Sequence, residues 1–364
     1  MMARYKLGEI CEIVSGSTPK SNVPEYWDGD IKWITPAELN DDSYIVDDSV
    51  RKITELGAQK TGLKPFPAGT VILSSRAPIG KVAIAGCPMF CNQGFKNLVC
   101  SSLIDNRYLF WFLKGNTQYL NSLGRGATFK EISKQIVANI EINVPSLEEQ
   151  QKAVNELERI RSIMILRRQQ LQQLDELIKA RFVEMFGDLR TNPKNWEIRT
   201  FDELTELITD GEHNTPRRVE RGIYLLSARN VLNHALQLDD VDYIDQEEYD
   251  RIAKRVVPQA GDVLISCSGS VGRCCSVPNG LKFQMVRSAA LLRFKPIINP
   301  IFAEYMVTSD GLQEQINSSK TASSQANLFQ GKIAKLKGFV PPIELQNEFL
   351  QFARQADKSK VVYH

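Results

Sequence analysis

The chain has 364 residues, of which 43% are hydrophobic and 24% charged, a balance typical of a soluble globular protein with room for two ordinary domains. Its formal net charge of +2 excludes a uniformly basic nucleic-acid binder, but not a local basic face. No apolar run approaches the roughly 20 residues of a membrane span, and the N-terminal residues lack the apolar stretch of a signal peptide, so we expect a cytoplasmic protein.

The seven cysteines and three histidines offer little material for a metal site. Cys87 and Cys91 could form half of a zinc site, but no second pair stands at a ligand spacing. Several of the cysteines lie in apolar, strand-like runs, where a free thiol behaves as a small hydrophobe. We therefore expect no bound metal.

The first part of the chain reads as an α+β domain. The stretch LGEICEIVSGSTP (7–19) predicts an amphipathic helix followed by a Gly-rich turn, and IKWITPAEL (31–39) predicts a strand. In PAGTVILSSRAPIGKVAI (67–84), an apolar strand leads into a Ser-rich turn, then a glycine with a cation, then a second strand. Acidic residues concentrate in 38–48 and basic residues in 107–134, which indicates a dipolar surface.

A long helix follows this first domain. Residues 146–185 contain neither Gly nor Pro, Ser146 and Glu149 form a capping box, and Gly187 marks the end. At about 1.5 Å per residue the helix is a rod of about 60 Å. Its apolar residues recur at heptad spacing, which predicts pairing with another helix. They are Leu157, Met164, Leu171, Ile178 and Met185, widened by Ile160, Leu174 and Phe182.

The second half of the chain repeats the first. FDELTELITDGEHNTP (201–216), IYLLSARNV (223–231) and QAGDVLISCSGSVGRCCS (259–276) follow in the same order as their counterparts. Equivalent positions keep a near-constant separation, from Val71 and Val263 (192 apart) to Gln150 and Gln346 (196 apart). We expect a second domain of the same plan and a shorter second helix, with Phe349 and Phe352 on its pairing face.

Familiar catalytic motifs are absent from the sequence. The Gly-Lys turn at Gly80 resembles a phosphate-binding loop, but Ser75 stands where its first glycine belongs and Val82 replaces the magnesium-binding hydroxyl. GRGAT (124–128) lacks the third glycine of a dinucleotide fingerprint. Two similar domains without a shared catalytic constellation indicate recognition performed twice. Two alternatives remain: a scaffold that binds only proteins, and an enzyme that uses the Gly-Lys turn on nucleotides.

The order of these motifs, with CNQGFKNL, VPSLEEQQKAV and MFGDLRTNPKNWE between them, resembles the specificity subunits of type I restriction–modification enzymes. The resemblance implies two target-recognition domains, each reading one half of a bipartite, asymmetric DNA site, separated by long antiparallel helices that set the spacing of the half-sites. It places the first recognition domain at 1–145, the spacer helix at 146–186, the second domain at 187–341 and a shortened distal helix at 342–364.

The same resemblance implies a bacterial or archaeal chain with no catalysis and no cofactor of its own. Modification subunits, two in number, would bring S-adenosylmethionine and methylate adenine, and restriction subunits would bring ATP and Mg²⁺. Because the distal helix is short, a second specificity chain is an alternative way to complete the helix pair.

Candidate DNA-binding residues lie in polar segments between the apolar strands, where Asn and Gln suit adenine edges and Arg suits guanine. The candidates in the first domain are Ser75, Arg76, Lys81, Asn92, Gln93, Lys96, Arg125, Thr128 and Lys130. Those in the second domain are Arg217, Arg218, Arg229, Asn230, Ser268, Ser270, Arg273, Arg287, Lys320, Ser323 and Gln325. The alternative is that recurring turn residues serve the fold of both copies; for Gly80 and Gly272 we expect this backbone role.

Overall fold

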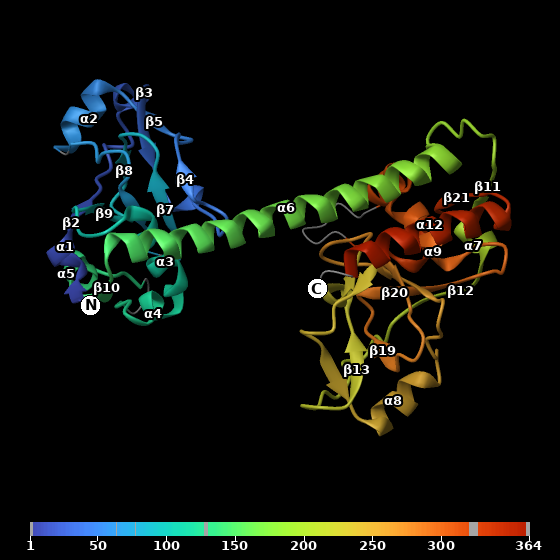
Figure 1. The fold of residues 1–364 in the computed structure, drawn as a ribbon. Coiled ribbons are helices and arrows are strands. Elements are labelled where there is room, and N and C mark those ends of the chain that lie inside the picture. Colours follow the sequence, from blue (N-terminus) through green and yellow to red (C-terminus); the bar gives the residue numbers. More distant parts are fainter. Residues whose placement is uncertain (1–2, 63, 77, 127–129, 320–326, 362–364) are drawn as a thin grey trace. The chain divides into compact units, whose positions relative to one another are not determined.

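The computed structural model describes residues 3–62, 64–76, 78–126, 130–319 and 327–361, without the side chains of the last two. The chain forms two compact units, Met1–Leu166 and Arg167–His364, and the division falls inside the long helix α6 (Leu147–Phe186). Each unit contains small sheets flanked by helices (Figure 1). In the described ranges, every helix is too short or too polar to cross a membrane.

Three sheets organise the first unit. Strands β1 (Ala3–Lys6) and β10 (Glu141–Val144) pair antiparallel and bring the two ends of the unit together. The main sheet has the order β2 (Cys11–Ser15), β9 (Lys96–Cys100), β6 (Val71–Leu73), β7 (Val82–Ala85), β4 (Ile45–Val46). The third sheet has the order β5 (Lys52–Ile53), β3 (Trp27–Ile34), β8 (Phe90–Cys91), in which β3 and β8 run parallel.

Short helices surround these sheets. The described helices of the first unit that precede α6 are α1 (Leu7–Ile10), η1 (Pro24–Tyr26), η2 (Pro36–Glu38), α2 (Glu55–Thr61), α3 (Asn106–Gly115), α4 (Thr117–Ser122) and α5 (Lys134–Ala138).

The second unit repeats this topology. Its sheets are β11 (Glu197–Thr200) with β21 (Lys337–Val340), the series β12 (Thr205–Asp210), β20 (Ala289–Phe294), β17 (Val263–Ser266), β18 (Cys274–Ser276), and the series β16 (Asp242–Ile244), β13 (Ile223–Leu226), β19 (Phe283–Met285). A hairpin of β14 (Val231–Leu232) and β15 (Ala235–Leu236) is added. The helices are α7 (Phe201–Leu204), η3 (Ala228–Asn230), α8 (Gln246–Ala253), α9 (Pro300–Thr308), α10 (Asp310–Ser319), α11 (Gln330–Ile333) and α12 (Ile343–Val361).

The strand order is therefore the same in both copies, and the predicted internal repeat is confirmed. The series β2-β9-β6-β7 of the first unit corresponds to β12-β20-β17-β18 of the second. Each three-stranded sheet contains one parallel pair, β3 with β8 in the first unit and β13 with β19 in the second. The α+β class with two similar units follows directly from this order. The two halves of the chain, whose equivalent positions lie 192–196 residues apart, thus have the same fold.

One predicted element is wrong in both copies. The segments that begin at Leu7 and Phe201 were expected to form amphipathic helices, but each makes only a single helical turn and then enters a strand. In the first copy the strand β2 pairs along its full length with β9, from Cys11 opposite Cys100 to Ser15 opposite Lys96. Pairing with a buried strand supplies hydrogen bonds and burial that a second helical turn could not, so tertiary context decides the conformation.

Helix α6 begins and ends as the sequence predicts. The Ser146 hydroxyl donates to Glu149 at 2.8 Å, and Glu149 also accepts the Ser146 backbone N–H, which completes the capping box. At the other end, the Gly187 N–H bonds to Val183 O, and Gly187 has φ +82°, a left-handed conformation that glycine adopts without strain.

A buried glutamine fixes each long helix to its own unit. Gln150 of α6 accepts the Asp105 N–H at 2.8 Å and donates to Leu103 O and Pro145 O. Gln346 of α12 accepts the Asn299 N–H at 2.8 Å and donates to two equivalent carbonyls. Both side chains are fully buried. The repeated motif ending in this glutamine is therefore a structural joint between helix and domain.

The second half of α6 pairs antiparallel with α12 within the second unit (Figure 1). Arg181 makes an ion pair with Glu348, and Arg167 donates to Ser359 O. Phe182 packs edge-on against Phe349 at 5.4 Å between ring centroids. These contacts run in opposite directions along the two helices, so this part of the predicted helix pairing is present.

The predicted pairing residues separate into two groups. Ile178 and Phe349 are buried, and Leu171, Leu174 and Phe352 are partly buried. The other two, Leu157 and Met164, are 37% and 52% exposed. For these two residues pairing with another helix stays a prediction.

Candidate nucleic-acid interface

The repeated Ser-rich turn has one geometry in both copies. The Ser74 hydroxyl donates to Pro78 O at 2.8 Å and accepts the Lys81 N–H at 2.8 Å. The Ser266 hydroxyl does the same with Ser270 O and the Arg273 N–H, at 2.6 and 2.9 Å. Both serines are fully buried. The amides of the glycine and of the following cation are thus bonded inside the protein in both copies, which disfavours a phosphate-binding loop at this turn.

The two glycines of this turn are backbone necessities, as expected. Gly80 has φ +93° and Gly272 φ +91°, and each N–H bonds to the carbonyl of the turn serine. A Cβ on Gly80 would lie 2.9 Å from the Thr117 side chain, and one on Gly272 would lie 2.9 Å from that of Gln313. Only glycine satisfies both the conformation and the space.

Several candidates of the first domain serve the fold. Lys81 donates through Nζ to the carbonyls of Pro36 and Leu39 and so caps the η2 turn. Ser75 is fully buried, and its backbone bonds to Gly94 and Ile132. The prediction that Ser75 and Lys81 contact DNA is therefore replaced by a structural role, because their polar groups are already used inside the unit. Asn92 is partly buried, and its side chain accepts the Gly94 N–H.

Loops of the first unit and the first residue of β9 bring a set of polar side chains together at one end of its main sheet. We call this set the first rim. Its members are Thr18, Arg76, Gln93, Lys96, Arg125, Lys130 and Glu131.

Contacts between these side chains define the first rim. The Thr18 hydroxyl donates to Gln93 Oε1 at 2.5 Å. Glu131 accepts from Arg76 Nε at 3.0 Å and from Lys96 Nζ at 3.3 Å. Arg125 pairs through its backbone with Glu131. Two cations therefore bind one carboxylate, and the exposed Arg125 and Lys130 lie in the same loop as Glu131, an arrangement suited to a polyanionic partner.

Glu131 is the electrostatic centre of the rim. Partial burial raises its pKa, but hydrogen bonds and charge attraction from Arg76 and Lys96 outweigh burial, so the pKa lies below its usual value of 4.5. The carboxylate is therefore ionised at neutral pH and holds both cations in position. Lys96 is 7% exposed, whereas Arg76 lies on the surface.

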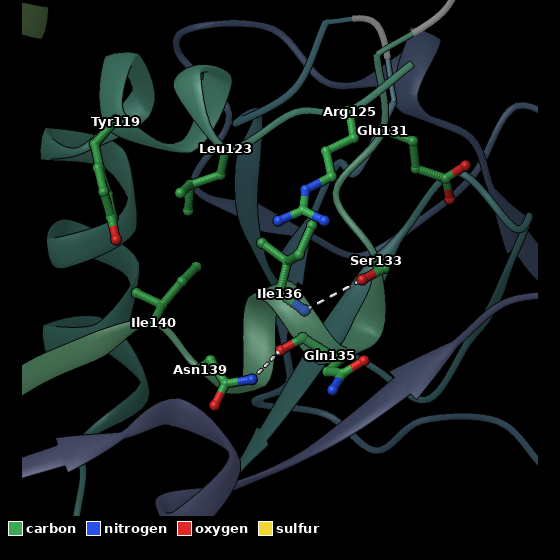
Figure 2. A pocket seen from close by; sticks show the side chains of 9 residues that line it. All are labelled: Tyr119, Leu123, Arg125, Glu131, Ser133, Gln135, Ile136, Asn139 and Ile140. Atoms are coloured by element: carbon green, nitrogen blue, oxygen red, sulfur yellow. Dashed lines mark hydrogen bonds between the residues drawn. The ribbon is translucent and has the colours of Figure 1, made fainter.

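A hollow of about 570 Å³ lies beside Arg125 (Figure 2). Its wall includes Tyr119, Ser133 and Asn139, and Figure 2 shows the Arg125 side chain extending toward the start of α5. The Glu131 side chain points the other way. Arg125 is thus exposed and directed over a polar hollow, whereas Arg76 and Lys96 are held by Glu131.

The equivalent surface of the second unit has other side chains on the same framework. The main-chain bonds Ser75 N–Gly94 O and Ile132 N–Ser75 O recur as Cys267 N–Ser288 O and Leu328 N–Cys267 O. These bonds align Arg76 with Ser268, Gln93 with Arg287, Lys96 with Ala290 and Glu131 with Asn327. We call His213, Ser268, Arg287 and Asn327 the second rim.

The second rim surrounds a hollow of about 480 Å³. His213 lies 2.8 Å from Asp210, which also bonds to Arg255 at 2.5 Å. Arg287 lines the hollow and is exposed. The two rims therefore differ in charge and hydrogen-bonding groups at each of the aligned positions, although their backbones match.

Three other candidate DNA-binding residues of the second domain are not part of the second rim and form ion pairs with acidic residues. Arg217 bonds to Asp245 and Glu247, and both Arg218 and Arg229 pair with Asp242. Their charges are balanced by acids in the free chain.

The other candidate DNA-binding residues of the second domain are buried, lie at the repeated turn or lie outside the described residues. The prediction for Asn230 is wrong: it is 1% exposed and bonds to the carbonyls of Gln237 and Asp240. Ser270 is exposed and Arg273 partly buried at the turn. Thr128, Lys320, Ser323 and Gln325 lie outside the described residues.

Sequence reasoning missed three rim residues. Thr18 and His213 sit in the repeated turns GSTP and GEHNTP, which were noted for their shape only. Glu131 is the single acid in the basic segment 107–134. The signal available for all three was their position beside candidates already chosen, but only the folded backbone shows that these loops meet.

No group of three or more His, Cys, Asp or Glu side chains suited to a metal exists among the residues described. The two cysteines considered for zinc have other contacts. Cys87 Sγ accepts from Lys32 Nζ at 3.3 Å, and Cys91 Sγ accepts from the Asn97 amide at 3.1 Å.

Comparison with known proteins agrees with this architecture. Residues 2–176 match the family described as the type I restriction modification DNA specificity domain. This match spans almost half of the chain, and curated proteins that are also similar to the chain are specificity subunits of type I restriction enzymes. The resemblance inferred from the motifs is thereby confirmed, including the two-unit repeat typical of these subunits.

Two curated specificity subunits illustrate the similarity. The MjaIX specificity subunit of Methanocaldococcus jannaschii is 34% identical over 231 residues, which cover 58% of this chain and 53% of that protein. The EcoprrI specificity subunit of Escherichia coli is 23% identical over 93% of this chain and 84% of its own length. The chain thus spans about half of the first relative and most of the second.

Solved structures share the fold. A chain from a study of complex assembly and conformational transition in the type I R-M system has a TM-score of 0.57 at 18% identity, over 99% of this chain and 91% of its own. The S subunit from M. genitalium has a TM-score of 0.51 at 15% identity, over 100% and 91% of the two chains.

Proposed function

We propose that the chain is a specificity subunit that reads a bipartite DNA site, the first half through the first rim and the second half through the second. The chain itself would catalyse no reaction. Modification subunits would supply S-adenosylmethionine chemistry and restriction subunits ATP-driven cleavage, as the resemblance drawn from the sequence motifs implies.

One observation carries the proposal. The two units share a backbone framework down to the hydrogen bonds of one turn, while the side chains at the adjacent rims differ. A fold that repeats in order to read two different half-sites requires this combination, because phosphate contacts tolerate any sequence and base contacts do not. Gln93 suits an adenine edge, whereas Arg287 at the equivalent position suits guanine.

The contact set of the proposal is narrower than that expected from the sequence alone. We assign Arg76, Gln93, Lys96, Arg125 and Lys130 to the first half-site, with Lys96 acting through the Glu131 network. Ser268 and Arg287 remain for the second half-site, joined by His213 and Asn327. Ser75, Lys81 and Asn230 leave the set, because their polar groups are bonded within the fold.

The decisive experiment maps methylated adenines in cells that express this chain with its cognate modification subunits. The proposal predicts a split motif with a fixed gap. Gln93→Arg should change the first half of the motif and leave the second unaltered. The matched control is Lys60→Ala, which removes an exposed cation of α2 outside the rim and should leave the motif unchanged. A motif altered in both halves by Gln93→Arg would contradict the assignment of rims to half-sites.

Salt dependence distinguishes DNA binding from the scaffold alternative. If several phosphates are neutralised, the affinity for duplex DNA falls steeply with salt, and Lys130→Ala should reduce the slope of log K against log salt by about 1. Binding that is insensitive to salt would favour a protein partner instead. ATP hydrolysis by the isolated chain would support the nucleotide-enzyme alternative, and we expect none.

A further inference from the structure

Two cysteines of the first unit face each other across its main sheet. In the antiparallel pair β2–β9, Cys11 lies directly opposite Cys100. The Cys11 N–H bonds to Leu7 O within its own helical turn, and the Ser101 N–H bonds to Ile10 O across the sheet. Cys11 and Cys100 therefore occupy a non-hydrogen-bonded pair, the site where opposite side chains approach most closely.

The spacing of such a pair fits a disulfide. Opposite Cα atoms at a non-hydrogen-bonded site are about 4.5 Å apart, and disulfides span Cα separations from about 4.4 Å upward. The neighbouring Cys11 thiol, together with burial, raises the pKa of Cys100 far above its usual value. Cys11 is 7% exposed and Cys100 is partly exposed, so Cys100 is the thiol that a small oxidant reaches first.

The second unit supplies an internal comparison. The position equivalent to Cys11 and Cys100 is held there by Thr205 and Phe294, which are also directly opposite in the sheet. The fold thus does not require a cysteine pair at this site. The other cysteines within described strands lie opposite other residue types: Cys91 opposite Ile34, Cys274 opposite Ile265 and Cys275 opposite Leu264.

We propose that Cys11 and Cys100 form a reversible cross-strand disulfide when the chain meets a low-molecular-weight disulfide such as oxidised glutathione. The Cys100 thiolate attacks one sulfur of the oxidant and expels one thiolate. The Cys11 thiolate then attacks the Cys100 sulfur of this mixed disulfide and expels the second. Two protein S–H bonds are exchanged for one S–S bond, and the oxidant takes up both electrons and both protons and leaves as two thiols.

The full chain, reduced and then treated under native conditions with oxidised glutathione, tests this inference independently of DNA binding. Free thiols are alkylated, the chain is digested without reductant, and linked peptides are identified by mass spectrometry. We expect a Cys11–Cys100 linkage that dithiothreitol removes. Because the Cys100 thiol is protonated at neutral pH, linkage should form faster as the pH rises.

Stability provides a second measurement. The linkage closes a loop from residue 11 to residue 100, so oxidation should raise the melting temperature of the first unit by about 10 °C, and dithiothreitol should reverse the rise.

Three variants control the experiment. Cys11→Thr adopts the residue found at the equivalent site of the second copy and should abolish the linkage, and Cys100→Ser repeats the test should Cys11→Thr fold poorly. Cys87→Ser removes another partly exposed thiol and should leave the linkage intact. Two outcomes would overturn the proposal: both thiols still free under conditions that modify Cys87, or a stable glutathione adduct on Cys100 beside an unreacted Cys11.

Discussion

At the scale of single residues, the residues that recur in both copies are different from those proposed to contact DNA. The residues that recur in both copies, Ser74 with Ser266 and Gly80 with Gly272, hold the turn together through buried hydrogen bonds. The residues that differ at equivalent positions lie at the rims. Recurrence in the sequence therefore identified the framework, and the candidates for base reading are the neighbours that do not recur.

Gly80→Ala should destabilise the first unit by about 1–3 kcal/mol, since alanine at φ +93° is strained and its Cβ would meet Thr117 at 2.9 Å. The matched control is Gly115→Ala at the end of α3, where a Cβ meets no atom within 4 Å. Urea unfolding monitored by circular dichroism measures both. A cost for Gly115→Ala equal to that of Gly80→Ala would contradict the explanation.

Glu131 predicts a pH dependence. Its pKa is lowered in the folded chain, so its contribution to stability is present above the ordinary value of 4.5 and is lost as the pH falls through the folded pKa. Glu131→Gln should therefore be less stable than the parent at neutral pH, and the difference should shrink as the pH falls below 4.5. Urea midpoints of both proteins across this range test the point, and a difference that stays constant with pH would refute it.

At the scale of elements, each long helix is joined to its unit by a buried amide rather than by apolar contact alone. Gln150 satisfies one backbone N–H and two carbonyls that loops would otherwise leave unpaired, and Gln346 does the same in the second copy. Leaving such groups buried without partners is costly. The direction in which each helix leaves its unit is thus set by specific hydrogen bonds.

Gln150→Met should destabilise the first unit by about 3 kcal/mol, because methionine fills the space but pairs with none of the three backbone groups. Gln169→Met, at an exposed position of the same helix, should have little effect. Comparison of their urea midpoints separates the lost hydrogen bonds from a change in helix propensity. Equal midpoints would show that the joint contributes nothing.

At the scale of the whole molecule, the chain consists of two units with one topology and separate cores. Phe182 and Phe186 of α6 belong to the core of the second unit together with Phe302, Phe339 and Phe349. The two ends of α6 therefore each become part of a domain. The proposed function depends on this independence, since each rim must recognise its own stretch of DNA.

Exchange of residues 195–340 for the equivalent segment of another specificity subunit should alter one half of the methylated motif and leave the other half unchanged. The physical reason is that each unit has its own sheets and core, so the exchange preserves the first rim. Sequencing of methylated adenines measures the outcome. A change in both halves would mean that the units do not read independently.

The sequence by itself determined the repeat, the capping box at Ser146, the end of α6 at Gly187 and the heptad pattern of the pairing helix, because these depend on local chemistry and on spacing along the chain. Only the tertiary structure decided that CEIVS is a strand, that Lys81 and Asn230 are bonded inside the fold, and that Glu131 holds Arg76 and Lys96 together. Each of these depends on partners distant in the sequence, and a strand, a bonded cation or a rim exists only once those partners meet.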